Sequence, residues 1–413
     1  MPAAPILILL PAPLVPLEAV GGVREQDGER VILGLGLVRR AVLAARRAGY
    51  RQVFTLSANR DATAGAADAP GWSQFAASLT SSHAAPLVIA PAAILAETDW
   101  LERLAKARIE PAAWAAIPNR IVMVAAASTS GALDALDEKG GARDLIAVES
   151  LLARRFGSPA AILAGIDPIV VETPADVRLA ERRLMRALVK DTDGFMARHV
   201  ERPISLQISR LLAPTAITPN QMSLISIVVG ICGAPFLLSQ RASLQTIGAL
   251  LFLAHSILDG CDGELARLKF EESRWGGVLD FWGDNVVHVV VFACMAIGWS
   301  VSAAAGWPLL FGAAAVLGTL GSAGLVYWRL MRAKDDGGSL FTSVSAEPER
   351  PLARALDAAS RRDFIYLVLL LALFGKSNWF LLLAALGAPI YFCLVIFLAA
   401  RERFVETRGS SGA

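Results

Sequence analysis

The sequence predicts two unlike parts: an α/β doubly wound N-terminal domain, followed by an all-α domain of six transmembrane helices. Hydrophobic residues make up 55% of the 413 residues and charged residues only 18%. The charged residues are common before about residue 210 and nearly absent from several long stretches after it. Short aliphatic runs alternate with helical patterns in the N-terminal part, which is typical of a layered α/β domain.

Changes in the pattern of charged and apolar residues along the chain give the expected domain boundaries. We expect an α/β domain over 1–189, an interfacial amphipathic helix and linker over 190–219, a six-span domain over 220–402 and a polar tail over 403–413. The second segment mixes basic and apolar residues at helical spacing, which fits a helix lying along a membrane surface. An ordinary linker helix would show the same pattern.

The N-terminal part contains five aliphatic runs that predict the strands of a parallel sheet. The expected strands are Ile6–Leu10, Gln52–Leu56, Leu87–Ala90, Arg120–Ala125 and Ala161–Leu163, and the expected helices are Gly34–Ala48 and Ala175–Val189. No basic residue precedes Ile6, and prolines follow Leu10, so this run predicts a buried strand and not a cleaved signal peptide.

The spans beyond residue 220 are predicted from uncharged stretches, because a helix needs about 20 apolar residues to cross a membrane. Such stretches cover 221–240, 242–258 and 285–328, and 364–400 carries only Lys376. The third stretch is long enough for two helices, and we extend the first of these back to Gly276. The last stretch divides near Lys376. Basic loops on one side place both termini and the acidic segment on the cytoplasmic face of the inner or cell membrane.

Charge and cysteine content exclude other classes. The formal net charge of +2 does not indicate nucleic-acid binding. The four cysteines have no CxxC spacing, so neither a zinc site nor a disulfide framework is predicted.

Four aspartates carry the chemistry that the sequence suggests. Asp259 and Asp262 are three residues apart in the second span, and Asp280 and Asp284 are four apart in the third. Each pair therefore shares one helix face, and the two helices can direct four carboxylates at one cleft. A buried carboxylate near the membrane centre costs about 2.5–3.5 kcal/mol, so the group requires cations. Oxygen ligands favour Mg²⁺, Mn²⁺ or Ca²⁺.

The residues around these aspartates have two interpretations. Gly263, Gly276, Gly277 and Gly283 leave room for a bulky ligand, although close helix packing also uses glycine. Arg267 has the paired donors that bind phosphate, but an arginine at a helix end also reaches the membrane surface. The aspartates themselves could be helix-end carboxylates that pair with nearby basic residues.

The string Asp259-x2-Asp262-Gly263-x2-Ala266-Arg267-x8-Gly276-x3-Asp280-x3-Asp284 resembles the signature of the CDP-alcohol phosphotransferase (CDP-alcohol phosphatidyltransferase) family. Thr218-Pro219-Asn220 also resembles the motif that precedes the first span in that family. The resemblance covers residues 191 to about 402.

This resemblance implies a membrane transferase that moves a phosphatidyl or phosphoinositol-type group from a CDP-alcohol to a second alcohol and releases CMP. By position, Asp259, Asp262, Asp280 and Asp284 would hold two Mg²⁺ or Mn²⁺ ions, and Asp284 would also accept the proton of the attacking hydroxyl. Gly263, Ala266, Arg267 and Gly276 would line the cytidine diphosphate site. The implied partners are a CDP-alcohol donor, an alcohol or lipid acceptor and membrane lipids, and a homodimer is compatible with the family.

The N-terminal part resembles the nucleotidyltransferase domain of fused inositol-1-phosphate cytidylyltransferase/di-inositol-phosphate phosphate synthases, through Thr173–Asp176 and Lys190–Phe195 at the junction. It departs from that pattern twice. Prolines 11, 13 and 16 stand where the glycine-rich phosphate loop is expected, and Ala90-Pro91-Ala92 replaces an expected metal-binding aspartate. We therefore expect a retained fold without its chemistry. The alternatives are a bifunctional enzyme that also makes the CDP-alcohol, and a membrane scaffold or transporter without catalysis.

Overall fold

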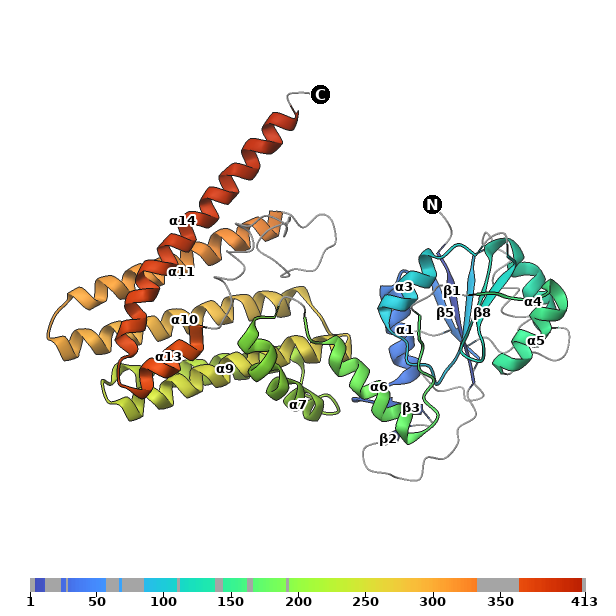
Figure 1. Ribbon diagram of the computed structural model, residues 1–413, viewed down its shortest axis with the longest axis horizontal. Helices are drawn as coiled ribbons and strands as arrows, with labels where there is room; N and C mark the ends of the chain where they lie inside the picture. The colour runs from blue at the N-terminus through green and yellow to red at the C-terminus, as the bar shows by residue number, and fades with distance from the viewer. Residues whose placement is uncertain are drawn as a thin grey trace. The chain divides into compact units, whose positions relative to one another are not determined.

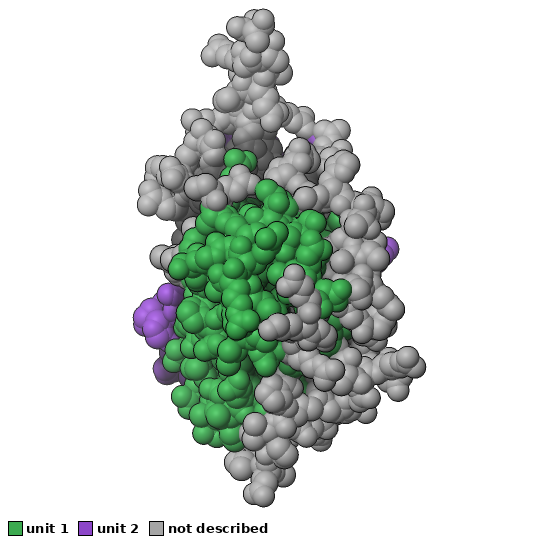
Figure 2. Space-filling view, turned by 90° about the vertical axis from the view of Figure 1, so that its right-hand side faces the viewer, with its two compact units in different colours: residues 1–186 green, residues 187–413 purple. Residues whose placement is uncertain are grey.

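The computed structural model divides the chain into two compact units, residues 1–186 and 187–413 (Figure 2). It describes residues 4–11, 24–26, 29–56, 67–68, 85–109, 112–137, 144–161, 166–190, 193–332 and 364–410. The proline-rich stretch after the first strand, residues 12–16, lies outside this set, as do residues 162–163 of the last predicted strand.

The first unit is built on a sheet with the strand order β10-β8-β9-β7-β1-β5-β6. Its central strand, β1, pairs in parallel with β5 and β7, and all five residues of β1 are buried aliphatic residues, as a strand covered on both faces requires. The strands are β1 (Ile6–Leu10), β5 (Gln52–Thr55), β6 (Ala67–Asp68), β7 (Leu87–Pro91), β8 (Trp114–Ile117), β9 (Ile121–Val124) and β10 (Ala160–Ala161).

The sheet is mixed, so the prediction of an entirely parallel sheet was wrong at one strand. β9 runs antiparallel to both β7 and β8. Only Pro118, Asn119 and Arg120 separate β8 from β9, too few residues for the crossover that parallel neighbours need. Asn119 adopts a φ of 57°, which turns the chain tightly into a hairpin.

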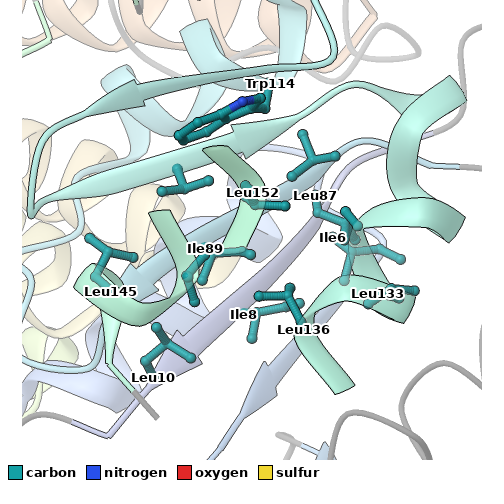
Figure 3. Packing of buried hydrophobic residues seen from close by; sticks show 14 of the residues in the cluster. Ile6, Ile8, Leu10, Leu87, Ile89, Trp114, Leu133, Leu136, Leu145 and Leu152 are labelled. Atoms are coloured by element: carbon teal, nitrogen blue, oxygen red, sulfur yellow. The ribbon is translucent and has the colours of Figure 1, made fainter. Parts of the chain in front are cut away.

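Helices cover both faces of the sheet, as predicted: α1 and α3 lie on one side, and α4 and α5 on the other (Figure 1). Figure 3 shows Ile6, Ile8 and Leu10, alternate residues of β1, on the face where Leu136 of α4 and Leu145 of α5 pack. The helices are α1 (Leu37–Arg47), α3 (Thr98–Lys106), α4 (Thr129–Asp137), α5 (Leu145–Phe156) and α6 (Pro174–Ala187), with a short turn η1 (Ala126–Ser128). A separate antiparallel sheet contains β2 (Arg24–Gln26), β3 (Glu29–Ile32) and β4 (Leu35–Gly36).

The second unit is helical in the residues that the structure describes. Five of its helices are long and apolar enough to cross a membrane, which makes this an integral membrane protein. A sixth apolar helix, α13, has only ten residues from Phe364, where the described chain resumes. The elements are η2 (Ala197–Glu201), α7 (Arg202–Leu212), α8 (Pro219–Gly233), η3 (Ala234–Leu238), α9 (Ala242–Lys269), α10 (Arg274–Ala303), α11 (Trp307–Arg332), α13 (Phe364–Leu373) and α14 (Ser377–Ser410).

Helix α8 packs against both α9 and α10, and glycine allows the close approach. A Cβ atom at Gly230 would lie 2.6 Å from Val287 on α10 and 3.0 Å from His255 on α9. A Cβ atom at Gly283 would overlap with the side chain of Ile227 on α8. The start of α8 is fixed by Thr218, which forms a capping box with Gln221. These contacts bring the acidic stretches of α9 and α10 to the same region.

Candidate active site

Three of the four predicted aspartates lie together. One carboxylate oxygen from each of Asp259, Asp280 and Asp284 can be chosen so that all lie within 4.8 Å of one another. Asp259 comes from α9 and the other two from α10. Oxygens at this separation can share one hard cation or a pair of cations.

The same cluster is unfavourable without a counterion. Asp259 is only 5% exposed, and Asp280 Oδ1 is buried with no hydrogen-bond partner among the residues that the structure describes. Like charges at this distance repel, and a buried carboxylate oxygen without a partner carries a desolvation cost. The donor set, oxygen atoms only, therefore fits a divalent metal ion.

Asp262 lies outside this group of three. It is 7% exposed, and its Oδ2 accepts a hydrogen bond from Ser223 Oγ on α8. Asp262 follows Asp259 by three residues and so shares its helix face. The structure thus places the fourth aspartate beside the cluster, with one oxygen already bonded to a neighbouring helix.

A histidine that the aspartate spacing did not reveal touches the cluster. His255 Nε2 lies 3.4 Å from Asp284 Oδ1, and His255 Nδ1 lies 2.9 Å from the carbonyl oxygen of Ser226. Because a carbonyl oxygen only accepts, Nδ1 carries a proton. The sequence could have indicated this contact, because His255 precedes Asp259 by four residues and therefore lies on the same face of the second span.

Arg267 lies against Gly263, one turn before it on α9. A Cβ atom at Gly263 would be 3.3 Å from Arg267 Nη1, so glycine leaves the space that the guanidinium uses. Arg267 Nε is buried with no hydrogen-bond partner in the described part of the chain. The carbonyl oxygen of Ala266 accepts a hydrogen bond from the backbone N–H of Glu271 at 2.9 Å, just beyond the helix end.

Gly276 lies at the start of α10, beside the motif that precedes α8. Its N–H donates to Ser273 Oγ at 2.9 Å, and a Cβ atom there would lie 2.8 Å from Asn220 Oδ1. Close contact with Asn220 explains why the position is glycine. Gly283 likewise leaves room for the side chain of Ile227, so both glycines allow α10 to approach α8 closely.

Sequence reasoning missed Glu264, which is completely buried. It accepts hydrogen bonds from Arg202 on α7, and Arg202 is also paired with Asp193. Partial burial acts to raise the pKa of Asp193, but hydrogen bonds from Arg202 outweigh it, and this pKa lies below its ordinary value. The expected surface helix is thus anchored to α9 by polar side chains, while Leu211 of α7 is 74% exposed.

Comparison with known proteins matches residues 216–391 to the CDP-alcohol phosphatidyltransferase family. A protein of Rubrobacter xylanophilus named bifunctional IPC transferase and DIPP synthase is 41% identical over 153 residues, 37% of this chain and 34% of that protein. Its namesake from Thermococcus kodakarensis is 42% identical over 127 residues, 30% of this chain and 28% of that protein. The chain thus spans about a third of the length of these relatives.

A solved structure is similar as well. Mycobacterium tuberculosis phosphatidylinositol phosphate synthase with CDP-DAG bound aligns over 47% of this chain and 92% of that chain, with 19% identity and a TM-score of 0.34.

Proposed function

We propose that this membrane protein, whose residues 216–391 match the CDP-alcohol phosphatidyltransferase family, transfers a phospho-alcohol group from a CDP-alcohol to a second alcohol and releases CMP. The observation that carries this proposal is the meeting of Asp259, Asp280 and Asp284, whose carboxylate oxygens lie within 4.8 Å inside the matched region.

The aspartates are the proposed metal ligands. Asp259, Asp262, Asp280 and Asp284 would hold two divalent ions, Mg²⁺ or Mn²⁺. When bound, such ions would neutralise the diphosphate of the donor and the charge of the leaving CMP. Asp280 Oδ1, which has no hydrogen-bond partner among the residues that the structure describes, supports this assignment, because coordination to a metal ion would satisfy it.

The proposed reaction has a simple balance. The hydroxyl oxygen of the acceptor forms a bond to the phosphorus that bears the donor's alcohol, and the bond from that phosphorus to the bridging oxygen of CMP breaks. The hydroxyl proton passes to Asp284, the proposed general base, and the bridging oxygen leaves with CMP. His255, 3.4 Å from Asp284, borders the carboxylate that receives this proton.

The donor nucleotide would lie along the adjacent part of α9 and the start of α10. Gly263, Ala266 and Gly276 are the proposed lining, and Arg267 the proposed phosphate ligand. A buried guanidinium nitrogen without a partner among the described residues supports this role, since a phosphate oxygen would supply the acceptor.

We propose a substrate pair from the names of the relatives. Inositol-type alcohols fit the IPC transferase and DIPP synthase named among the relatives, with CDP-inositol or CDP-diacylglycerol as donor.

We further propose that α13 forms part of a sixth span and that the site and both termini face the cytoplasm. Residues 1–189 are proposed to retain a nucleotidyltransferase-like fold without its activity.

The test is a product screen with the purified full-length protein in nanodiscs with Mg²⁺. CDP-inositol and CDP-diacylglycerol are each paired with inositol phosphate and with a diacylglycerol or dialkylglycerol acceptor, and new phosphodiesters are identified by mass spectrometry. At least one pair should give a phosphodiester together with CMP. Absence of a phosphodiester in every pair, with the protein folded and metal present, would refute the proposal.

A further inference from the structure

The side of α9 opposite the acidic cluster is held by buried polar contacts with α7. Glu264 has no exposed surface. Its Oε1 accepts hydrogen bonds from Arg202 Nη1 and Ser205 Oγ, both at 2.7 Å, and its Oε2 accepts one from Ser209 Oγ at 2.7 Å. All three donors belong to α7, so a single carboxylate joins the two helices at three points.

The position of this carboxylate relates it to the proposed metal ligands. Glu264 follows Asp262 by two residues, about 200° around the helix. Cys261 follows Asp259 by the same interval, and its Sγ donates to the carbonyl oxygen of Ser205 at 3.5 Å. The two aspartates therefore face away from α7, while Glu264 and Cys261 face toward it. Contacts with α7 consequently help to fix the rotation of α9 about its own axis, together with the packing of α8 on α9.

A small rotation would be enough to disturb a metal site. Side chains end about 5–6 Å from a helix axis, so a turn of about 10° moves a carboxylate oxygen by about 1 Å. Metal–oxygen distances are held within about 0.2 Å in working sites. The contacts that prevent rotation of α9 thus bear directly on whether its aspartates reach ions shared with α10.

Arg202 is itself fixed from a second direction. Its Nε donates to Asp193 Oδ2 at 2.9 Å and its Nη2 to Asp193 Oδ1 at 3.0 Å, a bidentate arrangement. The side chain of Arg202 is 14% exposed and that of Asp193 10%. With its guanidinium held on both sides, Arg202 offers Glu264 a donor in a defined place, which a flexible surface pair would not.

We infer that Arg202 and Glu264 are positioning residues for the metal site, which hold α9 at the rotation that brings Asp259 and Asp262 to ions shared with Asp280 and Asp284. The inference rests on the proposed metal site but not on the identity of the substrates. Neither residue would touch the ions, since Glu264 lies on the opposite face of α9.

The experiment measures Mn²⁺ binding to the purified full-length protein, from the electron paramagnetic resonance signal of free Mn²⁺, together with the unfolding temperature of each variant. The double variant Arg202→Met/Glu264→Gln removes both charges of this pair, so that Glu264 is not left as a buried charge without its partner. Asp193 loses its two hydrogen bonds from Arg202 in this variant, and the unfolding temperature reports the cost of that loss. Ser209→Ala removes one hydrogen bond to Glu264 and provides a milder variant. Gln207→Ala, at an exposed position of α7, is the matched control.

The double variant should bind Mn²⁺ about tenfold more weakly, the size expected when residues supporting metal ligands are lost. Ser209→Ala should weaken binding in the same direction by a smaller factor, while its unfolding temperature stays near that of the wild type. Gln207→Ala should leave both quantities unchanged. Wild-type Mn²⁺ affinity in the double variant and in Ser209→Ala would overturn the inference and leave the metal site standing. Absence of Mn²⁺ binding by the wild type would instead refute the metal site itself.

Discussion

Ser223 on α8 donates a hydrogen bond to the carboxylate of Asp262 on α9. Both side chains are buried. The bond leaves Asp262 Oδ1 as the oxygen that is not shared with Ser223. A helix that contributes no aspartate to the motif thus orients one of its four carboxylates.

Ser223→Ala should raise the Mg²⁺ concentration needed for half-maximal CMP release by about tenfold, because it frees the carboxylate of Asp262. Ser226→Ala is the matched control: Ser226 is also buried on α8, but its hydroxyl donates to the backbone carbonyl of Ser223. A Mg²⁺ titration of CMP release by both variants measures the difference. Equal requirements in the two variants would show that the bond to Asp262 has no role in metal binding.

Arg267→Lys should weaken binding of the CDP-alcohol by about 1.5–3 kcal/mol, roughly 10- to 150-fold, if a charge-assisted hydrogen bond to phosphate is lost. Turnover at saturating donor should fall less, because Lys keeps the charge but lacks the paired donors of the guanidinium. Initial rates measured against CDP-alcohol concentration separate the two effects. An unchanged apparent affinity would indicate that Arg267 only anchors the helix end.

The first unit should not release pyrophosphate from CTP and an alcohol phosphate. Strand β7 ends at Pro91, and the next residue, Ala92, donates its N–H to the carbonyl oxygen of Leu10 at 2.7 Å. The edge where a nucleotidyltransferase would present a metal-binding aspartate thus carries alanine and proline. A pyrophosphate assay of the full-length protein is the check, and CTP-dependent release would establish the bifunctional alternative.

Gly298→Ala should lower the stability of the second unit, because the added methyl group would overlap with the carbonyl oxygen of Leu238 in η3. Gly324→Ala is the control, since nothing lies within 4 Å of its Cβ position. Alanine there should be neutral or stabilising by up to about 1 kcal/mol through helix propensity. Thermal unfolding in detergent compares the two variants, and equal unfolding temperatures would mean that α10 and η3 are not closely packed.

The sequence predicted β1 with its observed bounds because five consecutive aliphatic residues describe a central strand. It did not predict β8, where Trp114-Ala115-Ala116-Ile117 has no alternation and little β-branching. Because β8 was not predicted, the hairpin at Asn119 could not be predicted either, and β9 was assigned to a parallel sheet. The predicted orientation of β9 was therefore wrong because its neighbour β8 had not been predicted, whereas the residues of β9 itself were correctly read as a strand.

In the candidate site, helical spacing was enough to predict that Asp280 and Asp284 share a face. The meeting of these residues with Asp259 depends on packing among α8, α9 and α10, which no local pattern contains. Glu264 illustrates the same limit, because it lies inside the motif string but its partners Arg202, Ser205 and Ser209 precede it by more than 50 residues. Burial of a charge is decided by such distant partners.

The proposed reaction is tested best by measuring Mg²⁺-dependent CMP release by the purified full-length protein, given a CDP-alcohol and an acceptor alcohol, in parallel with Asp280→Asn. The wild type should release CMP only with a divalent ion. Asp280→Asn should insert and fold normally, since removing an intramembrane charge eases insertion, but release no CMP. Retention of most of the wild-type rate by Asp280→Asn, or equal activity of the wild type in EDTA, would refute the proposed metal-dependent transfer.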